Sequence, residues 1–244
     1  MINIKAYETQ IEISKAAREA LASFKEKNPE KFKKFIKWFH LRPGSGNVTI
    51  VTTHEERAMR GIKVGKTRIE SSAEFLADCI DTDGKTINWK KIAGKFNAEK
   101  GFEKGTGNGN KEYPFQAKMI NNLHDDKKLK KLIGVKNLFF IASEVVFSRG
   151  KEDRKKIDIV AHDGDGKVIF FEMKAPANER DKPVDQVNGY LELYGKDGTK
   201  NYIFEEMLKN YPQNPIEKIT GYDGYGVIGY SDNLSLKGEK LIGM

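Results

Sequence analysis

The sequence predicts an α/β fold in which a mixed β-sheet is flanked by helices, with a mainly helical region before it. Three runs rich in β-branched and aromatic residues, at 137–147, 156–161 and 167–174, predict consecutive strands. A helical pattern at 114–133 precedes them, and a helix at about 184–194 and a last strand at 224–230 follow. The order α-β-β-β-α-β is typical of a mixed sheet covered by helices.

The first third of the chain is predicted to be mainly helical. Apolar residues recur at helical spacing, and Pro29 can occupy the first turn of the second helix. The expected elements are a helix at 6–27, a helix at about 30–40, a turn at 42–46, a strand at 47–53, a helix capped by Ser71 or Ser72, and a helix at 88–99.

A glycine-rich stretch at 101–110 separates these two parts of the chain and predicts a linker or loop. We therefore expect an accessory region at 1–105 that binds nucleic acid or mediates dimerisation. The catalytic region is expected at 106–244.

Charge and cysteine content narrow the functional classes. Lys and Arg number 43 against 35 Asp and Glu, which gives a net charge of +8 and suits a polyanionic partner such as nucleic acid. The single cysteine, Cys79, excludes an internal disulfide and cysteine-based zinc or iron–sulfur sites, and is expected to be buried. The sequence has neither an apolar membrane span nor a signal-peptide pattern, so a cytoplasmic protein is expected.

The segment 156–174 carries the candidate chemistry. Its centre, Asp-Gly-Asp-Gly at 163–166, predicts a hairpin between two antiparallel strands. Side chains alternate across a strand, so Glu172 and Lys174 project from the same face. We expect Asp158 to join them in a polar cluster. The apolar face opposite is expected to contain Ile157, Ile159, Ile169, Phe171 and Met173.

This residue set suits phosphodiester hydrolysis. The reaction needs a hard cation that polarises a phosphoryl oxygen and lowers the pKa of an attacking water. Mg²⁺ takes oxygen ligands and keeps several waters, so Asp158, Glu172 and the backbone carbonyl of Met173 form a sensible protein share. Lys174 can hold the water and offset charge that develops on the phosphate.

Asp158, thirteen residues and then Glu172-Met173-Lys174 resemble the D…ExK signature of the PD-(D/E)xK, or restriction-endonuclease-like, nucleases. The proline that names the motif is absent, because Lys156 and Ile157 precede the aspartate. The resemblance implies an α-β-β-β-α-β core with a mixed sheet. It also implies that Asp158 and Glu172 bind Mg²⁺, for which Mn²⁺ can substitute, and that Lys174 assists the water.

Further matches lie on the helices beside this motif. Gln186 and Tyr190 resemble the QxxxY element of RecB-like nucleases, and their spacing places both on one helical face. Glu112 and Gln116 resemble an ExxxQ element of the family's first helix, in which the glutamate supports a metal or its water. Glu144, in the first strand, is a further candidate for that role.

The sequence thus predicts a metal-dependent nuclease that hydrolyses DNA, as an endonuclease of the restriction, defence or repair type. A homodimer would suit a cutter of both strands. The alternative is a non-catalytic nucleic-acid-binding protein in which two basic helices, the second in a helix-turn-helix-like unit, bind phosphates. The candidate residues for phosphate binding are Lys33, Lys34, Lys37, Lys90 and Lys91. Glu172 and Lys174 could also form a plain ion pair on an edge strand.

Overall fold

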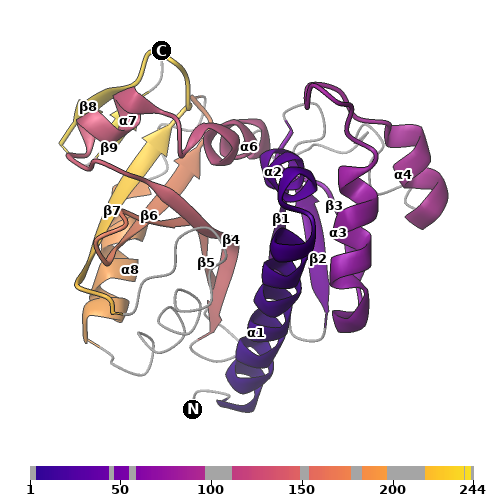
Figure 1. Cartoon of the computed structure of the whole chain (residues 1–244). Helices are drawn as coiled ribbons and strands as arrows, with labels where there is room; N and C mark the ends of the chain where they lie inside the picture. The colour runs from indigo at the N-terminus through magenta and orange to yellow at the C-terminus, as the bar shows by residue number, and fades with distance from the viewer. Residues whose placement is uncertain are drawn as a thin grey trace. The chain divides into compact units, whose positions relative to one another are not determined.

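The computed structural model describes residues 4–43, 47–54, 59–96, 112–148, 154–176, 183–196, 218–238 and 240–242. The chain forms two compact units, which Figure 1 colours from indigo to yellow along the sequence. One comprises Lys5–Gly109, and the other comprises Asn110–Met244 together with Met1–Ile4. The predicted boundary between 105 and 106, and the glycine-rich stretch around it, lie outside the described residues.

In its described residues, the N-terminal unit combines α-helices and a short 3-10 helix with a three-stranded antiparallel sheet of order β1-β2-β3. Its elements are α1 (Ile4–Lys27), α2 (Pro29–Trp38), β1 (Phe39–Pro43), β2 (Val48–Thr52), β3 (Gly61–Val64), a short 3-10 helix (Lys66–Arg68), α3 (Ile69–Ala77) and α4 (Trp89–Phe96).

Several elements of this unit differ from the sequence prediction. The second helix ends at Trp38, because Phe39 pairs with Thr52 and begins a strand where a helix and turn were expected. Strand β3 was not predicted at all. The third helix begins at Ile69, so Ser71 and Ser72 lie inside it and the predicted serine cap is wrong.

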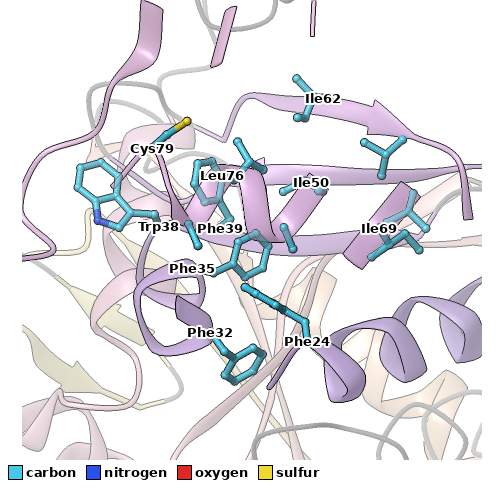
Figure 2. Packing of buried hydrophobic residues seen from close by; sticks show 14 of the residues in the cluster. Phe24, Phe32, Phe35, Trp38, Phe39, Ile50, Ile62, Ile69, Leu76 and Cys79 are labelled. Carbon is cyan, nitrogen blue, oxygen red and sulfur yellow. The ribbon is translucent and has the colours of Figure 1, made fainter. Parts of the chain in front are cut away.

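Aromatic side chains form the centre of the N-terminal core (Figure 2). Phe24 of α1 meets Phe32 and Phe35 of α2 edge-on, with ring centroids 6.1 and 6.0 Å apart. Phe35 in turn stacks on Phe39 of β1 at 5.6 Å. These contacts bind α1, α2 and the sheet into one core. Cys79 is 4% exposed, which confirms that it is buried.

The C-terminal unit is a mixed α/β structure with a six-stranded sheet of order β4-β5-β6-β7-β9-β8. Strands β4, β5 and β6 are antiparallel, whereas β7 runs parallel to β6 and to β9. The mixed sheet and its helices agree with the predicted fold class. The elements are α6 (Tyr113–Asn122), α7 (Lys127–Leu132), β4 (Phe139–Ser148), β5 (Arg154–His162), β6 (Lys167–Lys174), α8 (Pro183–Lys196), β7 (Gly221–Ile228), β8 (Ser235–Lys237) and β9 (Lys240–Ile242).

Two details of this unit correct the prediction. The single helix expected at 114–133 is two helices, because the Asp126 side chain accepts a hydrogen bond from Leu129 N at 2.8 Å and caps a new helix. Strands β8 and β9 were not predicted. None of the described helices has the length and apolar character needed to cross a membrane.

The predicted hairpin is confirmed. Strands β5 and β6 pair antiparallel from Ile159 opposite Phe171 to His162 opposite Val168. Gly164 and Gly166 in the turn have φ of 89° and 100°, a region that glycine adopts without steric cost. The turn therefore sets the register that aligns the two candidate strands.

Helix α8 packs directly on β7 and β6 (Figure 1). Two glycines of β7 make this approach feasible. A Cβ at Gly224 would lie 2.2 Å from Val187 Cγ1, and one at Gly226 would lie 2.9 Å from Pro183. Since Gly226 pairs with Glu172 in the parallel register, the bare strand brings α8 next to the candidate site.

Candidate functional site

Asp158 lies on β5 where this strand leaves its pairing with β6. Beyond the pair Ile159 and Phe171, Met173 N donates to Asp158 Oδ2 at 2.8 Å. The Asp158 carbonyl accepts from Gln116 Nε2 of α6, also at 2.8 Å. The side chain is half-buried. Asp158 is thus fixed on both sides, by the neighbouring strand and by a helix.

Glu172 and Lys174 project from the same face of β6, as predicted. Lys174 Nζ lies 2.8 Å from Glu172 Oε1, and the two residues are 8% and 3% exposed, respectively. Lys174 Nζ also lies 3.9 Å from Glu112 Oε1 at the start of α6. The structure therefore brings Glu112 to the lysine of the predicted trio.

Tyr190 of α8 completes the immediate surroundings of Glu172. Its hydroxyl lies 3.1 Å from Glu172 Oε2 and 2.7 Å from the carbonyl oxygen of Lys156, so its proton can serve either acceptor. Tyr190 is 2% exposed. Gln186, one turn earlier on α8, is exposed. Of the resembling Gln-Tyr pair, the tyrosine contacts the site.

A further acidic residue, Glu144, lies on β4, the neighbour of β5 on the side away from β6. It lies between Ser143 and Val145, which pair with Ile159 and Ile157, and so occupies the position opposite Asp158. Glu144 has φ of 56°, a left-handed conformation that is costly for a non-glycine residue within a strand. Its carboxylate is buried.

Glu144 is bound from two elements. Its carboxylate forms an ion pair with Lys156 of β5 and accepts from Gln116 Nε2 at 3.2 Å. Lys156 was not among the site residues predicted from the sequence. The signal was present, because Lys156 is two residues from Asp158 on the same strand and therefore shares its face.

The surroundings of Asp158 and Glu172 disfavour the charged forms of both carboxyl groups. Burial first, and then the charge of Glu172, raise the pKa of Asp158 to about 7. Burial also raises the pKa of Glu172, although its hydrogen bonds with Lys174 and Tyr190 oppose the shift. Two adjacent carboxylates in a poorly solvated place are stabilised by a cation between them.

Lys174 stays protonated in this setting. Burial tends to lower the pKa of its ammonium, but the hydrogen bond to Glu172 and the charges of Glu172, Glu112 and Asp158 outweigh burial and raise it. A pKa above the ordinary value for lysine means that Lys174 acts as a cation and a hydrogen-bond donor, and not as a base.

Oxygen donors of the type that divalent cations prefer gather at this site. The described site holds four carboxyl groups (Glu112, Glu144, Asp158 and Glu172) and two ammonium groups (Lys156 and Lys174), so two negative charges would be unbalanced with every carboxyl ionised. Within the described ranges, no group of three His, Cys, Asp or Glu side chains is placed to hold a metal. A share of two carboxylates and one carbonyl, with waters completing the shell, is what Mg²⁺ accepts.

The face that carries the trio is less polar than predicted. The apolar face expected from Ile157 to Met173 is buried, but the opposite face is buried as well. Val160, Val168 and Phe170 line it and pack in one cluster with Tyr190 of α8. The polar trio therefore occupies one end of a face whose remainder belongs to the core.

Some of the lysines predicted to bind phosphate contact other residues of the chain. Lys33 pairs with Glu30 at 2.7 Å, and Lys34 Nζ donates to the carbonyl of Asp81 at 3.0 Å. Lys91 Nζ lies 5.5 Å from the centre of the Phe75 ring. Lys37 of α2 and Lys90 of α4 are both exposed.

Helix α4 does not form the expected helix-turn-helix-like unit with the helix before it, and the residues that follow α4 lie outside the described part of the chain. Residues 78–88 separate α3 from α4, whereas such a unit has a turn of about three to four residues. Trp89 itself packs against Trp38 and Phe39, with ring centroids 6.1 and 6.4 Å away, respectively. Helix α4 thus contributes this tryptophan to the core.

Comparison of the chain with protein-family models, with curated proteins and with solved structures found no match.

Proposed function

We propose that this protein is a metal-dependent nuclease that hydrolyses DNA phosphodiester bonds at Asp158, Glu172 and Lys174. The observation that carries the proposal is the convergence of these three side chains from two adjacent strands, with Tyr190 bonded to one carboxylate. It rests on a local arrangement and on its resemblance to a D…ExK site. Among nucleases, we favour an endonuclease of the restriction, defence or repair type.

Each residue has a role that its position supports. Asp158, Glu172 and the Met173 carbonyl would hold Mg²⁺ or Mn²⁺. When bound, the ion supplies polarisation of a phosphoryl oxygen and a water of lowered pKa. Lys174, protonated beside Glu172, would orient the water and offset the negative charge that grows on the phosphate.

Tyr190 and Gln116 would keep these groups in position. Tyr190 holds Glu172 Oε2, and Gln116 holds the Asp158 carbonyl. Such supporting hydrogen bonds fix the orientation of metal-binding carboxylates. They would limit the motion of the acidic pair while substrate binds.

A cleavage assay tests the proposal. Linear duplex, circular duplex and single-stranded DNA are incubated with the protein in Mg²⁺, in Mn²⁺ and in excess chelator. Cleavage is expected with either metal and none with chelator, and cutting of circular DNA identifies an endonuclease. Lys174→Ala and Asp158→Ala should abolish cleavage while circular dichroism shows an intact fold.

Lys167→Ala is the matched control. Lys167 begins the same strand, and its Nζ lies 3.9 Å from an aspartate, Asp223. It lies at the opposite end of β6 from Lys174, so its loss should leave cleavage unchanged. Full activity in Lys174→Ala, or no cleavage of any DNA by the wild-type protein, overturns the proposal. Binding without cleavage in the wild-type protein would favour the non-catalytic alternative.

A further inference from the structure

A second lysine, Lys156, lies beside the candidate site and is held there from three directions. It shares the face of Asp158, two residues along β5. Its ammonium pairs with Glu144, its carbonyl oxygen lies 2.7 Å from the Tyr190 hydroxyl, and its positive charge partly opposes the rise in the pKa of the Asp158 carboxyl. Backbone and side chain are thus both restrained.

The exposure of the pair is asymmetric. The Lys156 side chain is 39% exposed, whereas that of Glu144 is 7% exposed. A pair made only for stability gains little when one partner is open to solvent. A buried carboxylate that holds a solvent-facing ammonium is instead suited to aim that ammonium outward.

The backbone at Glu144 supports a functional reason for this pair. Its φ of 56° interrupts β4 at the position opposite Asp158. Glycine would adopt this conformation without steric cost, so a glutamate here carries a conformational penalty. Gln116, which also holds the Asp158 carbonyl, donates to the same carboxylate. Glu144 is therefore tied to the geometry of the site.

We infer that Lys156 is a substrate-binding residue that contacts a phosphate of the nucleic-acid backbone beside the scissile bond, and that Glu144 is the positioning residue that aims it. This inference rests on the proposed nuclease function. It assigns Lys156 to binding and Lys174 to the chemical step. Glu144, considered above as a metal ligand, is assigned to Lys156 instead.

The two lysines should differ in kinetics. Steady-state cleavage of a duplex oligonucleotide is measured for wild type and Lys156→Gln over a series of KCl concentrations. A lost phosphate contact weakens binding equally in ground and transition states, so KM should rise roughly 3- to 10-fold with kcat nearly unchanged. The slope of log(kcat/KM) against log[KCl] should become shallower by about 0.9. Lys167→Gln is the matched control and should keep both wild-type values.

Glu144 is tested through its dependence on Lys156. Glu144→Gln should raise KM in the wild-type background and have no further effect in Lys156→Gln, because its action passes through that lysine. Glu144→Gly relieves the backbone conformation, so its melting temperature should equal or exceed that of wild type while KM still rises. A purely structural role would lower stability and leave the salt slope unchanged.

The outcomes separate the two levels of inference. If the wild-type protein cleaves DNA but Lys156→Gln keeps the KM and salt slope of Lys167→Gln, the role of Lys156 is refuted and the nuclease proposal stands. If Glu144→Gln has the same effect in both backgrounds, its positioning role is refuted. If the wild-type protein cleaves no DNA, the nuclease proposal fails and the inference falls with it.

Discussion

The Asp158 side chain takes a hydrogen bond from the backbone N–H of Met173, at 2.8 Å, where the paired register of β5 and β6 has ended. A side-chain oxygen thus replaces a strand partner. One residue therefore joins the two strands and presents a carboxylate beside Glu172. Stability and the proposed activity meet in this group.

Asp158→Asn should make the metal-free protein more stable at pH 8 while abolishing cleavage. Asparagine can still accept from Met173 N, but it carries no charge to desolvate. The pKa of Asp158 is about 7 in the folded protein and lower in the unfolded chain. Ionisation of this carboxyl therefore lowers the free energy of unfolding of the wild-type protein as pH rises from about 4 to 7. The gain in the free energy of unfolding should be about 1–3 kcal/mol at pH 8, and smaller at pH 5.

Chemical denaturation in chelator at both pH values measures this gain. Asp185→Asn, an exposed aspartate on α8, is the control and should show no gain. Added Mg²⁺ should raise the melting temperature of wild type and not that of Asp158→Asn. A less stable Asp158→Asn at pH 8 would show that this carboxylate stabilises the fold.

Tyr190→Phe should lower kcat by roughly 10- to 100-fold with little change in fold. The variant removes the hydroxyl that holds Glu172 Oε2, and a hydrogen bond to a charged group contributes about 1.5–3 kcal/mol. Tyr225→Phe loses a comparable contact, between its hydroxyl and Asp223 at 3.1 Å in the same sheet. Cleavage kinetics should be unchanged in that control. Equal cleavage rates for the two variants would show that the Tyr190 hydroxyl has no role in the reaction.

Gly224→Ala should destabilise the C-terminal unit by about 1–3 kcal/mol and reduce cleavage, because its Cβ would press on Val187 and displace α8 with Tyr190. The second substitution Val187→Ala should restore part of both losses. Gly221→Ala, on the same strand but with no atom within 4 Å of its Cβ, is the control. Thermal melting and cleavage rates check the result. An unaltered Gly224→Ala would mean that α8 can shift without consequence.

His162 should make stability fall on acidification. Burial lowers the pKa of His162 to about 4, and its Nδ1 accepts from Gly164 N at 3.1 Å, a bond that protonation removes. The folded pKa lies below the unfolded value near 6.5, so stability is complete above pH 6.5 and is lost as pH falls towards 4. The loss should reach roughly 3 kcal/mol.

Comparison with His162→Phe isolates this effect. Phenylalanine retains a ring that can stack on Phe139, which lies 5.1 Å from His162 between ring centroids, but it does not titrate. Its free energy of unfolding should change less between pH 6.5 and 4 than that of wild type. Parallel pH profiles for the two proteins would contradict the assignment.

The local geometry of the strands that carry the candidate residues could be predicted from the sequence. The turn at 163–166 aligns its own flanking strands, and the spacing of Glu172 and Lys174 alone places them on one face. Such features depend on alternation and turn chemistry within about twenty residues. Asp158 follows from the same hairpin, so the trio needed no knowledge of the rest of the chain.

Features set by distant pairing could not be predicted in the same way. Phe39 continues the helical spacing of Phe32 and Phe35, and only its pairing with Thr52 makes it a strand residue. Glu144 looks like an ordinary strand residue in sequence. Its left-handed backbone lies where β4 keeps a regular register with β5, so no spacing in the sequence indicates it, and only that register brings Lys156 next to it. The break before α7 was readable, because Asp126 is a favoured cap.

The backbone of Glu144 would set stability against the proposed activity at a single position. A population of this protein selected only for resistance to heat should drift towards glycine there, and one selected for cutting should keep the acid. In a lineage that did not need the proposed reaction, this position would be among the first to change.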